Sequence, residues 1–495
     1  MKPIQVGLLG IGTVGSGTFN VLQRNQEEIR RRAGRGIEIA MVADLDTERA
    51  RSVVGDTAKV VGDAREIIAN PEIDVVIELI GGYGIAKALV LEAIAAGKHV
   101  VTANKALLAV HGSEIFKAAA EKGVMVAYEA AVAGGIPIIK ALREGLTANQ
   151  IQWVAGIING TTNFILSEMR DKGLDFDVVL KEAQRLGYAE ADPTFDIEGV
   201  DAAHKLTIMA AIAFGIPMQF GGAHVEGISQ LQAVDLRYAE QLGYRIKLLG
   251  ITRRSHVDGL EGVELRVHPT LIPEARLIAN VEGISQLQAV DLRYAEQLGY
   301  RIKLLGITRR SFVDGHEGIE LRVHPTLIPA ARLIANVEGA MNAVLVKGDA
   351  VGTTLYYGKG AGAEPTASAV IADLVDVTRL ATVDPYARVP HLAFHPGELA
   401  DVPILPMAEI RTSYYLRVTV QDQLGVMADL TRILADAGIS IDAVLQKEPG
   451  EKARTDIVII THLTREKYVN AAIARIEGLA TTVNKVIRIR LESLG

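Results

Sequence analysis

The sequence predicts an α/β protein with three folded units: a doubly wound parallel sheet, an α+β domain and a C-terminal βαββαβ domain of ferredoxin-like order. Three observations predict this fold class. Short apolar strands alternate with helical segments in the first third of the chain, a glycine pattern follows the first strand, and the last segment has the order strand, helix, strand, strand, helix, strand. The length of 495 residues also exceeds what one hydrophobic core organises.

Composition narrows the classes of function. The net charge is -7, from 52 basic and 59 acidic residues, and this disfavours nucleic acid and anionic membranes as partners. The chain has no cysteine, which excludes disulfides, thiolate metal sites and a thiol nucleophile. The most apolar later stretch, residues 206–218, is too short to span a bilayer and contains Gly215 and Pro217. We therefore expect a cytoplasmic protein.

The first third predicts a Rossmann-type domain, residues 1–134. An apolar strand at 4–9 precedes a GxGxxG pattern, one helix from Val14 to about Arg32, and a second strand at 37–43. The glycines allow a tight turn, close approach of a pyrophosphate and close packing of helix on strand, and the helix N-terminus offers N–H donors to phosphates. The candidate cofactor-binding residues here are Gly10, Gly12, Thr13, Val14 and Gly15.

Asp44 ends the second strand, where a carboxylate can bind the ribose hydroxyls of NAD. Arg49 and Arg51 follow it and could bind a 2′-phosphate, so the sequence leaves NAD and NADP open. Further strands are predicted at 74–79, 99–102 and 124–128, with helical segments between them. This alternation predicts a parallel sheet whose ligand binds at the carboxyl ends of the strands.

Five motifs, in order and spacing, resemble the homoserine dehydrogenase family. They are VTANKALLA (101–109), YEAAVAGGIPII (128–139), NGTTNFIL (159–166), GYAEADPTFDIEGVDAAHKLTI (187–208) and YGKGAGAEPTASAV (357–370). The resemblance implies reversible hydride transfer between the nicotinamide ring and L-aspartate 4-semialdehyde, giving L-homoserine, in threonine and methionine biosynthesis. It also implies that residues 135–356 form a substrate-binding and dimerisation domain, and that residues 357–382 return to the cofactor domain.

Lys205 is the residue that we expect to handle the proton. It lies on a predicted helix at 199–213, and Asp201 precedes it by one turn on the same face. Most Asp–Lys pairs at this spacing are surface ion pairs, but the surrounding segment is strongly apolar. The resemblance implies that Lys205 and Lys105 are catalytic, with Lys105 near the cofactor, and that Glu190, Asp196 and Asp201 bind the substrate. The plainer alternatives are an exposed lysine at the start of a helix and a solvated acidic loop.

The resemblance implies three further sets of contacts. Gly187 and Gly362 would approach the cofactor, and the glycines from 358 to 362 precede a helix that begins near Pro365. A sodium ion would bind one carboxylate oxygen and main-chain carbonyls, with a structural role at the hinge between domains. Its ligands would be Glu129, Val132, Gly134 and Ile136.

The middle of the chain contains a tandem duplication. Residues 225–280 and 281–336 differ only at His256/Phe312, Leu260/His316, Val263/Ile319 and Glu274/Ala330. Such near identity is typical of unequal recombination or of an assembly error. Each copy predicts a helix (230–242) and a hairpin (strands 244–255 and 263–272), in the numbering of the first copy. The extra hairpin either hangs outside the fold as an insertion or extends the sheet.

A proline-rich linker, residues 383–412, precedes the C-terminal domain, residues 413–495. Strands at 414–420, 439–446, 455–462 and 483–491, with helices at 426–437 and 466–476, give the βαββαβ order. The loop DQLGV resembles the effector-binding turn of the ACT family, with threonine as the implied effector. Its candidate residues are Asp422, Gly425 and Val426. A dimerising module without a ligand is the alternative.

The predicted assembly is a homodimer or homotetramer. A rival from another class is an amino-acid-binding regulatory protein whose catalytic half is inactivated by the duplication. Within enzymes, the rival is another dehydrogenase that acts on an amino-acid semialdehyde or imine. An acylating semialdehyde dehydrogenase needs a thiol nucleophile, which this sequence lacks.

Overall fold

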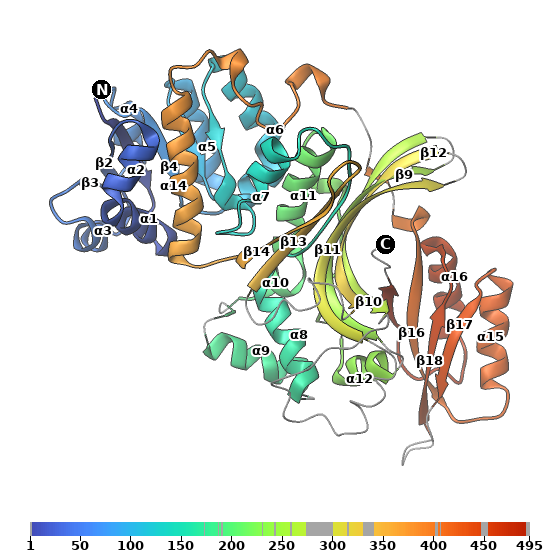
Figure 1. The fold of residues 1–495 in the computed structure, drawn as a ribbon. Helices are drawn as coiled ribbons and strands as arrows, with labels where there is room; N and C mark the ends of the chain where they lie inside the picture. Colours follow the sequence, from blue (N-terminus) through green and yellow to red (C-terminus); the bar gives the residue numbers. More distant parts are fainter. Residues whose placement is uncertain are drawn as a thin grey trace.

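The computed structural model describes residues 2–172, 174–186, 188–189, 192–229, 231–241, 244–257, 260–273, 300–313, 316–329, 341–400, 404–405, 407–446 and 454–491. Figure 1 shows an N-terminal unit in blue, a strongly curved central sheet in green and yellow, and a C-terminal unit in red. In the described part of the chain, no helix has the length and apolar character needed to cross a bilayer.

The N-terminal unit is a six-stranded parallel sheet with helices on its faces. Its strands run in the order β3-β2-β1-β4-β5-β6, which confirms the doubly wound fold. The strands are β1 (Ile4–Leu9), β2 (Ile37–Ala43), β3 (Lys59–Val61), β4 (Val75–Glu78), β5 (His99–Thr102) and β6 (Val126–Ala127). The helices are α1 (Thr13–Arg24), α2 (Gln26–Ala33), α3 (Thr47–Val54), α4 (Ala64–Ala69), α5 (Gly84–Ala95) and α6 (Lys105–Lys122). The strand order reverses between β1 and β4, where ligands of such sheets bind.

Burial on both faces explains why these strands are nearly continuous apolar runs. Leu8 and Leu9 are consecutive in β1, both are fully buried, and they belong to different core clusters. The predicted single helix from Val14 to about Arg32 is wrong. Asn25 leaves the helical conformation, with φ -110° and ψ 19°, so the segment divides into α1 and α2. The short strand β3 was not predicted.

Helix α14 (Ala363–Leu380) returns to this unit and packs along α1 (Figure 1). The packing is close: a Cβ atom on Gly17 of α1 would lie 2.7 Å from the Ala363 carbonyl oxygen. Val370 and Leu374 are fully buried in the same cluster as β1. The helix begins at Ala363, slightly earlier than predicted.

The central unit carries the duplicated hairpins. Strands β7 (Ile151–Ile157), β13 (Met341–Gly348) and β14 (Gly352–Lys359) form one side of its sheet. The two hairpins are β9 (Tyr244–Val257) with β10 (Leu260–Pro273), and β11 (Tyr300–Val313) with β12 (His316–Pro329). All four hairpin strands belong to the same sheet, in the order β7-β9-β11-β12-β10. The predicted hairpins therefore form, with longer strands than expected.

The helices of the central unit are α8 (Gly160–Lys172), α9 (Phe176–Arg185), α10 (Thr194–Ile197), α11 (Val200–Phe214) and α12 (Ala233–Gln241). Helix α11 matches its prediction to within a residue at each end. It is buried along almost its whole length, because small and apolar residues cover every face. It packs against α6 of the N-terminal unit and so joins the two units.

The proline-rich segment packs as an arm. Its first half reaches back to β6, where the Val126 N–H donates to His391 Nε2 at 3.1 Å. Burial lowers the pKa of His391 to about 4, so the imidazole is neutral and can accept this bond. Further along, the Ala400 N–H donates to the Gly215 carbonyl at the end of α11 at 2.8 Å.

The C-terminal unit has the predicted βαββαβ order. Its elements are β16 (Arg411–Gln421), α15 (Val426–Asp436), β17 (Ile441–Gln446), β18 (Arg454–Thr461), α16 (Glu466–Glu477) and β20 (Ile487–Leu491). A two-residue strand, β19 (Thr464–Arg465), precedes α16. The strand order β20-β16-β18-β17 is the ferredoxin-like arrangement. Strand β20 also pairs with β10, so the C-terminal strands continue the central sheet.

Candidate active site

Two lysines from different units converge on one buried carboxylate. Lys105 begins α6 directly after β5, and Lys205 lies on α11, one turn after Asp201. Lys105 Nζ lies 3.1 Å from Asp201 Oδ1, and Lys205 Nζ lies 2.7 Å from Asp201 Oδ2. The Asp201 side chain is 8% exposed and that of Lys205 is 12% exposed, so the alternative of a surface ion pair is wrong.

Lys205 has a second bond that fixes its direction. Its ammonium also donates to the carbonyl of Ile158, just beyond β7, at 2.7 Å. Lys105 is more open, with 37% of its side chain exposed. The two amines therefore stand side by side at the junction between the parallel sheet and the central unit.

The charges around Asp201 fix its ionisation. Burial alone would raise the pKa of Asp201, but Lys205 and Lys105 outweigh that effect and hold the pKa well below its ordinary value. Asp196 behaves in the opposite way: burial, followed by repulsion from Asp201, raises its pKa. One carboxylate is thus ionised throughout the physiological range, while its neighbour holds a proton more readily.

Asn159 joins these two carboxylates and was not predicted as a site residue. Its side-chain amide donates to Asp196 Oδ1 at 2.8 Å and to Asp201 Oδ2 at 3.0 Å, and the residue is 4% exposed. Its carbonyl oxygen accepts from the Thr162 N–H at 2.8 Å, which caps α8. Thr161 Oγ1 donates to the second oxygen of Asp196 at 3.0 Å. An asparagine between a strand and a helix is the signal that could have suggested the cap.

A second buried network, also missed, holds the start of α6. Glu78 at the end of β4 is fully buried and accepts from Thr102 Oγ1 at 2.7 Å and from the Ile80 N–H at 2.9 Å. The Asn104 N–H donates to Thr102 Oγ1, and the Asn104 side chain accepts from the Leu107 N–H, both at 3.0 Å. The network therefore sets the position from which Lys105 reaches Asp201.

The glycine loop fits a dinucleotide. Gly10 has φ +94°, and a Cβ atom on Gly15 would lie 2.1 Å from the Gly10 carbonyl oxygen. A Cβ atom on Gly12 would meet nothing within 4 Å, so the backbone there faces open space. Gly12 is also the N-cap of α1, and no side chain caps the N–H groups of the first turn of this helix. An uncapped helix N-terminus beside open space suits a pyrophosphate. Thr13 and Val14 form the first turn of this helix.

Asp44 lies beside this loop and is hydrogen-bonded to its backbone. One carboxylate oxygen accepts from the Ile11 N–H at 2.7 Å and the other from the Asp46 N–H at 2.9 Å. Each oxygen keeps a second lone pair, so the carboxylate can still accept a ribose hydroxyl.

The segment predicted to bind sodium is tightly folded. Both oxygens of the buried Glu129 carboxylate accept main-chain N–H groups, from Ile139 and Lys140, each at 2.8 Å. Burial raises the pKa of Glu129. Gly134 has φ +52°, and a Cβ atom there would lie 2.4 Å from the Gly360 carbonyl oxygen of the returning segment. Val132 and Ile136 lie in the same buried turn.

Some of the remaining predicted residues lie outside the described ranges, and the others lie at helix N-termini or at a strand end. Glu190 and Gly187 lie outside the described residues. Gly362 is the N-cap of α14, with φ +118°. Gly425 is the N-cap of α15, with φ +94°, and Val426 begins that helix, while Asp422 lies at the exposed end of β16. Across the described ranges, no group of three or more His, Cys, Asp or Glu side chains could hold a metal ion.

Family comparisons agree with this geometry. A family model described as homoserine dehydrogenase matches residues 137–283 and 279–375. The homoserine dehydrogenase NAD-binding domain matches residues 10–129, and the ACT domain matches residues 414–481. The three matches coincide with the central sheet, the parallel sheet and the C-terminal unit.

Whole-chain relatives carry the same name. The homoserine dehydrogenase of Pseudomonas aeruginosa is 54% identical over 495 residues, and that of Neisseria gonorrhoeae is 52% identical over 494 residues, with 100% of each chain covered in both cases. The crystal structure of a homoserine dehydrogenase from Thiobacillus denitrificans is 60% identical, with a TM-score of 0.83, and the match covers 100% of this chain and 99% of that one. The chain therefore belongs to the homoserine dehydrogenase family.

Proposed function

We propose that the chain interconverts L-homoserine and L-aspartate 4-semialdehyde with NAD or NADP. Membership of the family makes it an oxidoreductase, and the reaction is that of the family. The observation that supports the site is the convergence of Lys205 and Lys105 on Asp201 where α6 meets α11. This is the carboxyl edge of the parallel sheet, where the ligand of such a fold binds.

The domain division that supports this proposal has three parts. Residues 1–134 with the return segment at 357–382 bind the cofactor, because α14 shares the core of the parallel sheet. Residues 135–356 bind the substrate and build the assembly, a homodimer or homotetramer. Residues 383–412 connect them to a regulatory domain at 413–495.

The glycine loop and the N-terminus of α1 would hold the pyrophosphate, and Asp44 would accept a ribose hydroxyl. The family resemblance implies that Gly187 and Gly362 would lie near the nicotinamide. The bound cofactor supplies or accepts the hydride. Arg49 and Arg51 are exposed beyond Asp44, where they can meet a 2′-phosphate. Comparing KM for NAD and NADP in the unmodified chain and in Arg49→Ala tests which cofactor is preferred, because loss of a phosphate contact raises KM for NADP alone.

Lys205 exchanges the proton. Two of its N–H groups are directed to Asp201 and to the Ile158 carbonyl, which leaves one N–H for the substrate. When the aldehyde carbon receives the hydride, this ammonium donates its proton to the C4 oxygen, and the resulting amine accepts it in the reverse reaction. Lys105 stabilises the developing negative charge on that oxygen.

The family resemblance supports the proposal that Glu190, Asp196 and Asp201 bind the amino group of the substrate. Asp201 also holds the two lysines in place. Asn159 acts through these groups as a positioning residue, because its amide spans both aspartates.

We also propose a sodium ion at Glu129 with main-chain carbonyls of Val132, Gly134 and Ile136. Two buried carboxyls lie together there: Asp373 Oδ2 accepts from the Glu129 N–H at 2.6 Å, and burial together with Glu129 raises the pKa of Asp373 to about 8. A bound cation would favour the ionised forms of both carboxyls. Replacing sodium with choline at constant ionic strength should lower the melting temperature. An unchanged melting temperature would contradict a bound cation.

The C-terminal domain binds threonine through the turn formed by Asp422, Gly425 and Val426. The supporting observation is the uncapped N-terminus of α15, whose Gly425 lets a carboxylate approach the backbone. Inhibition of the purified chain by threonine, and its loss in Asp422→Ala, tests this proposal.

One assay separates the enzyme from the rival regulatory protein. The purified chain is mixed with homoserine and NAD or NADP, and reduction of the cofactor is followed by its absorbance. We expect turnover, because the described site residues lie before residue 225 or after residue 336. Deletion of residues 281–336 should retain that turnover. Activity that appears only after the deletion would favour the inactivated regulatory protein.

A further inference from the structure

A buried carboxylate lies between the glycine loop and the helix that begins with Lys105. Glu78 ends β4 at the carboxyl edge of the parallel sheet, and the residue is fully buried. On one side of β4, strand β1 ends directly before Gly10, and on the other side β5 ends at Thr102. Glu78 therefore stands where the cofactor half and the lysine half of the proposed site meet.

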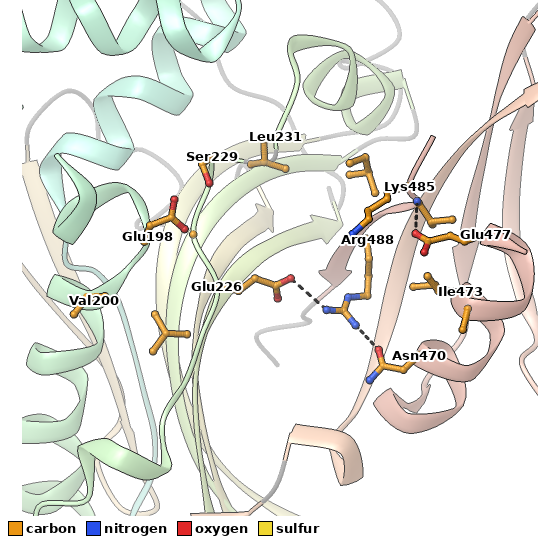
Figure 2. Close-up of a pocket in the computed structure, with 15 residues that line it drawn as sticks. Glu198, Val200, Glu226, Ser229, Leu231, Asn470, Ile473, Glu477, Lys485 and Arg488 are labelled. Carbon is orange, nitrogen blue, oxygen red and sulfur yellow. Dashed lines mark hydrogen bonds and ion pairs between the residues drawn. The ribbon is translucent and has the colours of Figure 1, made fainter. Parts of the chain in front are cut away.

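Two glutamates elsewhere in the chain show a different way to hold a carboxylate. They lie beside a cavity of about 790 Å³ between the central unit and the C-terminal domain, where Figure 2 shows Glu226 facing Arg488, 3.2 Å from its Nη2. Arg490 binds Glu226 through Nη1 at 2.6 Å and Glu466 through Nε at 2.8 Å. Arginine satisfies both carboxylates there with charge-assisted hydrogen bonds.

Glu78 has neutral donors instead. Its Oε1 accepts from the main-chain N–H groups of Ile80 at 2.9 Å and Gly81 at 3.2 Å, and its Oε2 accepts from Thr102 Oγ1 at 2.7 Å. Among the residues that the structure describes, no lysine, arginine or histidine forms an ion pair with Glu78. Burying a carboxylate without a cation is costly, so we infer that its bonds have a positional role.

The first oxygen holds the loop that follows β4. Its two N–H donors turn the chain directly after the strand, and Gly81 and Gly82 have φ +84° and +66°, which favours glycine. This loop presses on the glycine loop, because a Cβ atom on Gly10 would lie 2.8 Å from the Leu79 carbonyl oxygen. A Cβ atom on Gly81 or Gly82 would meet nothing within 4 Å, so the backbone there faces open space. The turn thus borders the reversal of strand order, where a cofactor would bind.

The second oxygen holds the start of α6. Thr102 Oγ1 donates to Glu78 and accepts the Asn104 N–H at 3.0 Å. The Asn104 side chain in turn caps α6 by accepting the Leu107 N–H at 3.0 Å. Lys105 is the first residue of this helix, so its position follows from the same series of bonds.

The loop and the helix are also tied to each other directly. The side-chain amide of Asn104 donates to the Gly82 carbonyl. One residue further along the loop, the Tyr83 ring meets His111 of α6 edge to face, with ring centroids 6.0 Å apart. A displacement of the loop is therefore transmitted to the start of α6.

We propose that Glu78 is a positioning residue that ties the cofactor-binding backbone to Lys105, with Oε1 setting the loop and Oε2 setting the amine. The inference rests on the proposed function, because it specifies how two parts of that site are held in register.

The two oxygens predict separable kinetic effects. Thr102→Val has the same shape and removes only the bond on the Lys105 side, so kcat should fall about 10–100-fold while KM for the cofactor stays within about twofold. Glu78→Gln keeps a carbonyl oxygen for the loop and should show the same pattern. Glu78→Leu removes both acceptors and should also raise KM for the cofactor, by about tenfold.

Two variants serve as controls for Thr102→Val. Thr102→Ser keeps the hydroxyl and should restore kcat. Thr378→Val removes an equally buried hydroxyl from α14 of the same unit, where its partner is the Leu374 carbonyl at 2.7 Å, and should leave both constants unchanged.

A double variant shows whether the effect passes through Lys105. In a Lys105→Met background, Thr102→Val should lower kcat by less than about twofold, because the group that it positions is absent. A further loss as large as in the unmodified background would overturn the proposal, and so would an unchanged kcat in both Thr102→Val and Glu78→Gln. An unmodified chain without turnover would instead contradict the proposed reaction, so the two failures are distinguishable.

Discussion

Two buried charge clusters in this chain have opposite designs. Around Asp201, two lysines share one carboxylate, and Lys105 remains partly exposed. Around Glu466, two arginines bind two glutamates, and Arg490 and Glu466 are 0% and 2% exposed. Arginine forks satisfy carboxylates with fixed geometry, whereas a lysine ammonium is a point charge that keeps donors for another group. The comparison teaches that burial of charge alone does not mark an active site; here the distinguishing feature is a lysine that pairs with a buried carboxylate and remains partly exposed.

The largest expected effect is at the Asp201 cluster. Lys205→Met should lower kcat by about 10²–10⁴-fold, because the proton donor is lost while Asp201 keeps Lys105. The melting temperature should change little. The control is Lys172→Ala, which breaks an exposed pair with Glu168 at the same i,i+4 spacing. A kcat within a few-fold of the unmodified enzyme would refute the role of Lys205.

At the Glu466 cluster the effect should fall on stability instead. Arg490→Met leaves the buried Glu466 without its main partner and should cost about 3–5 kcal/mol of unfolding free energy. Turnover per folded molecule should stay the same. Urea denaturation of Arg490→Met, Glu466→Gln and the double variant measures the coupling. Additive losses would show that the two side chains do not act as one unit.

Asn159 tests whether the Asp201 cluster depends on positioning. Asn159→Leu removes two donors from the aspartates and should lower kcat/KM by about 10–100-fold. The pKa of Asp196 should rise further, since an amide bond to its charged form is lost, and the acidic limb of the pH–rate profile should move to higher pH. Asn159→Ser, which keeps one donor, should restore part of the activity. A pH profile that does not move would indicate a purely structural role.

The smallest effect concerns acid stability. Burial alone would raise the pKa of Glu466, but Arg490 and Arg488 hold it at about 2, against 4.5 for the unperturbed group. As pH falls, the unfolded chain takes up this proton first. The stabilisation is therefore present above pH 4.5 and is lost progressively as pH falls towards 2. Glu466→Gln should show a flatter pH dependence in denaturation experiments. Equal slopes in the two proteins would contradict the assignment.

Sequence patterns predicted the secondary structure well where the apolar residues that are buried also follow the spacing of the element. The strands β1, β2 and β5 begin and end at their predicted residues. A short apolar run between turn residues defines both ends of such a strand. The break at Asn25 was missed, since the charged run after it continues a helical composition. Element ends depend on single residues that tertiary contacts can override.

The site shows the same division. The Asp201–Lys205 pair follows from helix spacing within one segment. The bridge from Asn159 to both aspartates spans more than thirty positions of the chain, because it depends on how α8 approaches α10 and α11. Contacts of this kind arise from packing between elements, which a pattern along one segment does not encode.

The close contact between the turn at Gly134 and the returning segment at Gly360 has a mechanical consequence. Two crossings between the parallel sheet and the central sheet are tied together here, because the Gly135 N–H donates to the Lys359 carbonyl at 3.1 Å. Two adjacent connections held together in this way allow rotation about the line that joins them and restrict twisting of one unit against the other. Rotation about this tie would change the distance between Lys105 on one unit and Asp201 on the other.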